Sequence, residues 1–101
     1  MKFTIKNEAG ENIVNLMRRV GYHFDGTDKE KSKLSFVHPI GSNLFPRFHI
    51  YLKENKEAKE IKIDLHLDQK KPIYKGAPAH SAEYKGEVVK KEAERIKNFF
   101  S

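Results

Sequence analysis

The segment Ile61–Asp68 constrains the fold most, because apolar and polar residues alternate along it without a break. Such alternation is typical of a half-buried β-strand, in which successive side chains point to opposite faces of the sheet. The aliphatic residues at positions 61, 63, 65 and 67 therefore face a core. The other face carries a row of ionisable groups at fixed spacing, namely Lys62, Asp64, His66 and Asp68.

The composition fits one domain with one modest core. The chain has 101 residues and no cysteine, which excludes disulfides and thiolate metal sites. No apolar run has the length of a membrane span and the start lacks a signal peptide, so we expect a soluble, cytoplasmic protein with no membrane partner. The net charge of +6 favours contact with nucleic acid, although interleaved acidic residues make a solvated, lysine-rich surface an alternative.

Two amphipathic helices are predicted near the two ends of the chain. The first spans about 8–20, with an apolar stripe at Ile13, Leu16, Met17 and Val20. Asn7 is its expected N-cap, and Gly21 is expected to end it. The second helix is predicted over 87–99.

Four strands are predicted between these helices, over 22–25, 34–38, 47–53 and 61–68. Residues 3–5 allow a further short edge strand, Asp25-Gly26 is expected to begin a turn that reaches Lys33, and 69–86 show no regular period. The order α-β-β-β-β-α predicts an α+β two-layer sandwich, with two helices on one face of a three- or four-stranded antiparallel sheet. The chain is expected to form a single domain over 1–101.

The strands over 47–53 and 61–68 are expected to form a hairpin. Their alternation allows two registers, with Leu52 opposite either Ile61 or Ile63. Both registers place His49 and His66 together on the sheet face that the helices leave open, within reach of at least one aspartate.

Three interpretations of this open face remain. It is a solvated polar surface, or it binds nucleic acid, or it carries out chemistry. For binding, Tyr51 would stack on a base and basic residues would meet phosphates; the candidates are Arg47, His49, Tyr51, Lys53 and Lys62, with Arg18 and Arg19 on the first helix. For chemistry, His49, His66, Asp64 and Asp68 are candidates for acid–base catalysis or for ligation of a divalent metal, and His80 would join them if its loop folds over the sheet.

Three segments resemble the HicA-type mRNA interferase toxins: Leu16–Tyr22, Ser35–Pro39 and Arg47–Ile50. In that family a basic helix ends in glycine plus an aromatic residue, and a strand closes in His-Pro. The resemblance covers about 12–53 and implies a fold like the double-stranded-RNA-binding domain. The family's catalytic histidine, however, lies in a Gly-Ser-His run, where this chain has Glu30–Leu34 without histidine. The resemblance therefore implies affinity for RNA rather than the family's ribonuclease chemistry.

The sequence as a whole favours a small nucleic-acid-binding domain, for RNA rather than DNA, that uses the open polar face of its sheet. The alternatives are a His/Asp-dependent phosphoester hydrolase and a module that binds a protein partner. No cofactor and no resident metal ion is predicted, and the sequence leaves open whether the protein is an enzyme.

Overall fold

The structure is a computed structural model that describes residues 1–70, 81–83 and 86–101. Its elements in chain order are β1 (Lys2–Lys6), α1 (Ile13–Val20), β2 (His23–Asp28), β3 (Lys33–Pro39), β4 (Arg47–Asn55), β5 (Glu60–Lys70), β6 (Ser81–Glu83) and α2 (Glu87–Phe99). The α+β class is confirmed, and the second helix has the predicted bounds.

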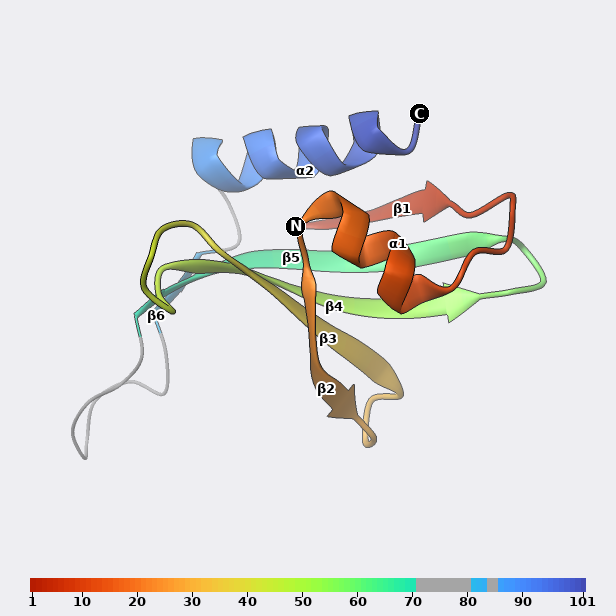
Figure 1. Cartoon of the computed structure of the whole chain (residues 1–101), viewed down its shortest axis with the longest axis horizontal. Coiled ribbons are helices and arrows are strands. Elements are labelled where there is room, and N and C mark those ends of the chain that lie inside the picture. The colour runs from red at the N-terminus through yellow and green to blue at the C-terminus, as the bar shows by residue number, and fades with distance from the viewer. Residues whose placement is uncertain (71–80, 84–85) are drawn as a thin grey trace.

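The sheet has more strands than predicted. Five antiparallel strands follow the order β1-β5-β4-β3-β2, and the short β6 pairs with β5 beyond the end of β1 (Figure 1). The predicted count of three or four strands is wrong because β1 joins the sheet in full. Its Phe3 and Ile5 lie opposite Ile63 and Ile61, so that β1 extends the aliphatic surface of β5.

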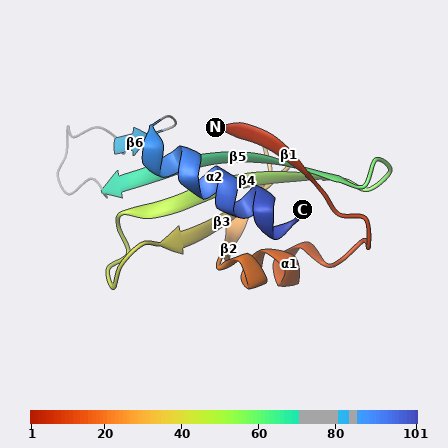
Figure 2. The same ribbon diagram turned by 90° about the horizontal axis from the view of Figure 1, so that it is seen from above.

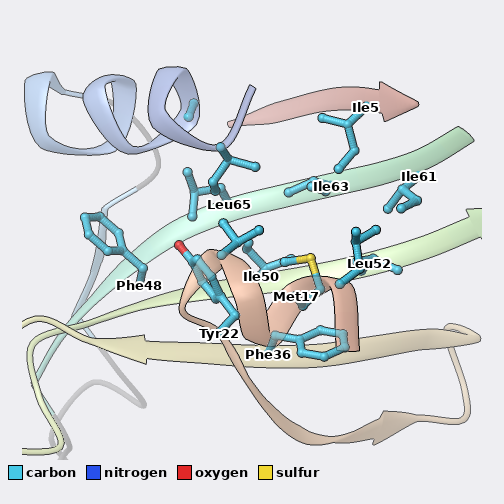
Figure 3. Packing of buried hydrophobic residues seen from close by; sticks show 14 of the residues in the cluster. Ile5, Met17, Tyr22, Phe36, Phe48, Ile50, Leu52, Ile61, Ile63 and Leu65 are labelled. Carbon is cyan, nitrogen blue, oxygen red and sulfur yellow. The ribbon is translucent and has the colours of Figure 1, made fainter. Parts of the chain in front are cut away.

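One apolar cluster lies between the helices and the sheet. It combines Leu16 and Met17 of α1, Val89 and Ile96 of α2, and the inward-facing residues of β4 and β5. Figure 3 shows Ile50, Leu65 and their neighbours pointing from the strands into this space. The helix α2 packs on β5, and α1 packs beside β2 (Figure 2). We call the sheet face turned away from both helices the outer face.

The helix α1 begins later than predicted. The chain has a positive φ of 64° at Gly10, which interrupts a right-handed helix, and Asn12 is the N-cap, its side chain accepting a hydrogen bond from the Asn15 N–H at 3.1 Å. Asn7 instead exchanges two hydrogen bonds with the backbone of Glu11. The end of the helix is as predicted, because Gly21 adopts the left-handed conformation with φ of 104°.

The predicted turn at Asp25-Gly26 is wrong. The strand β2 continues to Asp28, and the register of β2 against β3 shifts between Phe24 and Gly26, as in a β-bulge. Gly26 has φ of 117°, which glycine adopts without strain, so the same dipeptide that favours a turn here permits a bulge. The bulge includes Asp25, whose carboxylate lies close to Ser35 of β3.

The register of β4 against β5 is the second of the two predicted alternatives. Leu52 lies opposite Ile63, and therefore His49 lies opposite His66 and Arg47 opposite Asp68. The strand β5 continues through Lys70, and part of the segment expected to be irregular forms β6. Residues 71–80 and 84–85 of that segment, and with them His80, lie outside the described residues.

Candidate functional site

Three ionisable side chains meet on the outer face at the centre of the sheet. His49 on β4 and His66 on β5 are directly opposite, with ring centroids 4.8 Å apart, and Asp68 follows two residues along β5 on the same face. We call these three residues the His–Asp cluster. The prediction that both histidines share this face is confirmed.

The prediction that this part of the face is open is wrong. His49, His66 and Asp68 are exposed by only 7%, 3% and 5%. They alternate along β4 and β5 with the core residues Ile50, Leu65 and Leu67, so they lie on the opposite side of the sheet from the apolar core. Burial of ionisable groups is costly unless they are paired, so their contacts decide what the cluster is.

Asp68 is the centre of the cluster's contacts. Its Oδ2 accepts from Arg47 Nε and lies 3.1 Å from His49 Nδ1, while its Oδ1 lies 2.8 Å from His66 Nε2. Burial alone would raise the pKa of Asp68, but hydrogen bonds from both histidines and the nearby Arg47 outweigh it and hold that pKa well below its usual range. Asp68 is therefore an anion at neutral pH.

The other nitrogen of His49 continues the chain of contacts across the sheet. His49 Nε2 lies 2.6 Å from Ser35 Oγ, and Ser35 Oγ lies 3.4 Å from Asp25 Oδ2, to which it can donate its proton. Sequence reasoning missed Ser35 and Asp25 as site residues, because Asp25 was expected at the end of the strand over 22–25, where a turn begins. The alternation of Lys33, Ser35 and Val37 was the signal that places Ser35 on the outer face.

The order Ser35, His49, Asp68 is that of a nucleophile, a base and an orienting carboxylate. Ser35, however, lies inside a paired strand and is only 7% exposed. An acyl-transfer site also needs backbone N–H groups directed at the developing oxyanion, and strand pairing engages those of a ladder. The geometry therefore describes a proton-sharing or ligand-binding network better than a serine hydrolase.

A second feature lies further along the outer face. A hollow of about 310 Å³ is lined by Lys2, Phe3, Thr4, Lys33, Tyr51, Lys53, Lys62, Ile63 and Asp64. We call it the lysine hollow. Three of the predicted binding residues, Tyr51, Lys53 and Lys62, meet there. Lys2 and Lys33 were missed because neither stood within a predicted strand.

Tyr51 connects the two features. Its ring lines the hollow, and its centroid lies 4.6 Å from that of His49 and 5.9 Å from that of His66. The ammonium group of Lys31 lies 6.0 Å from the same ring. A ligand in the hollow would therefore contact a side chain that also packs on the His–Asp cluster.

Other predicted site residues lie elsewhere. Arg18 and Arg19 are exposed on α1, in the helical layer, and Arg19 pairs with Glu11. Asp64 lines the hollow and lies 3.8 Å from the amino group of Met1 instead of joining the cluster. His80 lies outside the described residues.

Comparison with protein-family models, with curated proteins and with solved structures finds no match. Among the described helices, none is long and apolar enough to cross a lipid bilayer.

Proposed function

We propose that the protein binds single-stranded nucleic acid, RNA in preference to DNA, on the outer face of its sheet. The observation that carries the proposal is the lysine hollow, in which Lys2, Lys33, Lys53 and Lys62 surround Tyr51. Basic side chains around an aromatic ring match the two parts of a nucleic acid strand, because lysines neutralise phosphates and the ring stacks on a base.

The placement of these lysines is unfavourable for stability alone. Lys53 and Lys62 lie directly opposite on β4 and β5, and like charges in that position repel. The next outward pair along the ladder, Tyr51 and Asp64, adds a single carboxylate to the hollow, against its four lysines. A phosphate bound between Lys53 and Lys62 would relieve their repulsion, so an anionic ligand explains a pairing that folding by itself disfavours.

The binding mode expected from these contacts is directed at the backbone. Single-stranded partners are favoured over duplex, since a base must leave its stack to reach Tyr51. RNA is preferred here because of the resemblance to the HicA-type toxins, which remains a prediction. Affinity is expected to fall steeply with salt, as each released counterion contributes to the slope.

The test is a filter-binding titration of labelled oligouridine against the whole chain at several salt concentrations. The double variant Lys53→Ala/Lys62→Ala is expected to bind about tenfold more weakly and to lower the salt slope by about 1.4, the value for two phosphate contacts on a single strand. The matched control is Lys90→Ala/Lys91→Ala, which removes two exposed lysines from α2 with the same change in charge. No retention at low salt, or equal weakening in both double variants, would contradict the proposal.

A second candidate function is metal-independent hydrolysis of phosphoesters at the His–Asp cluster. It is favoured by the short distance between the two imidazole rings, since a pair of histidines can supply a general base and a general acid. Turnover of a generic phosphodiester that His66→Gln abolishes and His23→Gln leaves intact would support it. A wild-type chain without turnover across pH 5 to 8, where histidines change charge, would remove it.

A further inference from the structure

We propose that His49, His66 and Asp68 bind a divalent transition-metal ion of the Zn²⁺ type. Each residue offers one ligand atom, and the three atoms lie within 4.8 Å of one another. The proposal goes beyond nucleic-acid binding and does not depend on it, because none of the three residues lines the lysine hollow.

The backbone holds the three donors on a rigid frame. His49 and His66 are a directly opposed pair of neighbouring strands, and Asp68 is the next residue of β5 on that face. A tetrahedral ion bound at about 2.1 Å keeps its donors about 3.4 Å apart. The three candidate ligand atoms lie within 4.8 Å of one another, so closing to that spacing requires shifts of little more than about 1 Å.

The outer nitrogen of His49 already has the kind of partner that a metal-bound imidazole needs. Ser35 Oγ lies 2.6 Å from His49 Nε2 and 3.4 Å from Asp25 Oδ2, so it can accept a hydrogen bond from Nε2–H while it donates its own proton to Asp25. In that arrangement Nδ1, 3.1 Å from Asp68 Oδ2, is the nitrogen that would ligate a metal ion. Ser35 then acts as the outer partner that holds a ligating imidazole in its tautomer.

Arg47 is the group that opposes a metal ion, because its guanidinium already contacts Asp68 Oδ2. Its side chain is 21% exposed, and its guanidinium lies 4.6 Å from the centre of the Phe45 ring. Asp68 Oδ1, on the other side of the carboxylate, faces His66 rather than Arg47. A metal ion held through Oδ1 would therefore leave the contact between Oδ2 and Arg47 in place.

The chemistry of the donors selects the class of ion. Two imidazole nitrogens and one carboxylate suit Zn²⁺, Co²⁺ and Ni²⁺, whereas Mg²⁺ and Ca²⁺ prefer oxygen ligands throughout. Three protein ligands leave a coordination position for water or another ligand. The expected order of affinity is therefore Zn²⁺ and Ni²⁺ above Co²⁺, with no competition from Mg²⁺.

The test uses the whole chain after treatment with a chelator. Co²⁺ is titrated and the visible absorption of the bound ion is followed, and Zn²⁺ is then added to displace it. We expect one site per chain, and we expect Asp68→Asn and His66→Gln to weaken binding by roughly two orders of magnitude. The control is His23→Gln, which removes an exposed histidine on β2 and is expected to bind as the wild type does.

A second measurement uses only the wild-type chain, so it tests the proposal even if the cluster variants fail to fold. In the wild-type chain, Zn²⁺ is expected to shift the ring NMR signals of His49 and His66 and to leave those of His23 and His38 in place. Absence of binding at millimolar metal would overturn the proposal and leave the cluster as a hydrogen-bonded network around Asp68. Equal binding by wild type and both cluster variants, or shifts confined to other histidines, would also overturn it.

Discussion

Two buried carboxylates, one on each side of the sheet, are satisfied in different ways. Glu92 of α2 accepts a hydrogen bond from the Tyr22 hydroxyl at 2.7 Å and a pair from Arg95 at 2.7 and 2.8 Å. Asp68 on the outer face contacts Arg47, His49 and His66. The first carboxylate has one cation and one phenol, whereas the second has one cation and two imidazoles.

The difference separates a structural network from a candidate site. Arg95 balances the charge of Glu92 and also donates to the Val20 carbonyl at the end of α1, so this network joins α2, α1 and Tyr22. Around Asp68, the guanidinium of Arg47 already balances the carboxylate charge, yet the imidazole rings of His49 and His66 contact the same carboxylate. Nitrogen donors in excess of the need for charge balance are what a ligand site requires.

Removal of Glu92 is expected to have the largest effect on stability. Glu92→Ala leaves the Tyr22 hydroxyl buried without its acceptor and removes the carboxylate that pairs with Arg95. We expect the free energy of unfolding to fall by about 2 to 3 kcal/mol, below the full value for a buried pair because Arg95 is half exposed. Urea denaturation measures this change, and binding of RNA and Co²⁺ by the folded variant is expected to stay at the wild-type level.

Asp68→Asn is expected to cost less, about 1 to 2 kcal/mol, since the amide keeps the shape and some of the hydrogen bonds of the carboxylate. Its main effect is expected on Co²⁺ affinity rather than on the denaturation midpoint. If Asp68→Asn destabilises the protein more than Glu92→Ala does, the comparison fails and the cluster is a structural network like the first.

Tyr22→Phe tests the structural network through pH. Burial, with the hydrogen bond to Glu92, raises the pKa of Tyr22 far above its usual value near 10. Because the folded-state pKa is the higher one, the stabilisation is present below pH 10 and is lost as pH rises further. We expect wild-type stability to fall by about 1.4 kcal/mol per pH unit more steeply than that of Tyr22→Phe above pH 10. Parallel slopes in denaturation series at pH 9 to 11 would show that Tyr22 ionises in the folded protein.

The sequence predicted those features that depend on strict periodicity. The alternation in 61–68 and 47–53 placed His49 and His66 on one face and limited the register to two choices, one of which is observed. The helix-ending Gly21 and the bounds of α2 follow equally local rules. These features need only the pattern of a single segment or of two adjacent ones.

The features that were missed depend on contacts between distant segments. The bulge at Asp25 and the full length of β1 depend on pairing with β3 and β5, and the short pattern over 3–5 only allowed an edge strand without requiring one. Ser35 joined the site only because β2, β3 and β4 are neighbours. Burial of the His–Asp cluster was also missed, because polar alternation predicts a wet face and gives no sign of pairing on that face.

In the lysine hollow, one substitution is expected to change stability only slightly and to change stability and RNA affinity in opposite directions. Lys53→Glu replaces a repulsive cross-strand contact with an attractive one to Lys62, so stability is expected to rise by about 0.5 kcal/mol. RNA affinity is expected to fall in the same variant, because a carboxylate now lies where phosphate would bind. The control Lys29→Glu makes the same change in charge at an exposed position of the turn after β2 and is expected to alter neither quantity much. A Lys53→Glu variant that gains stability and loses RNA binding would show that Lys53 serves its ligand rather than the fold. Loss of stability without loss of binding would show instead that Lys53 has a structural role, as Glu92 does.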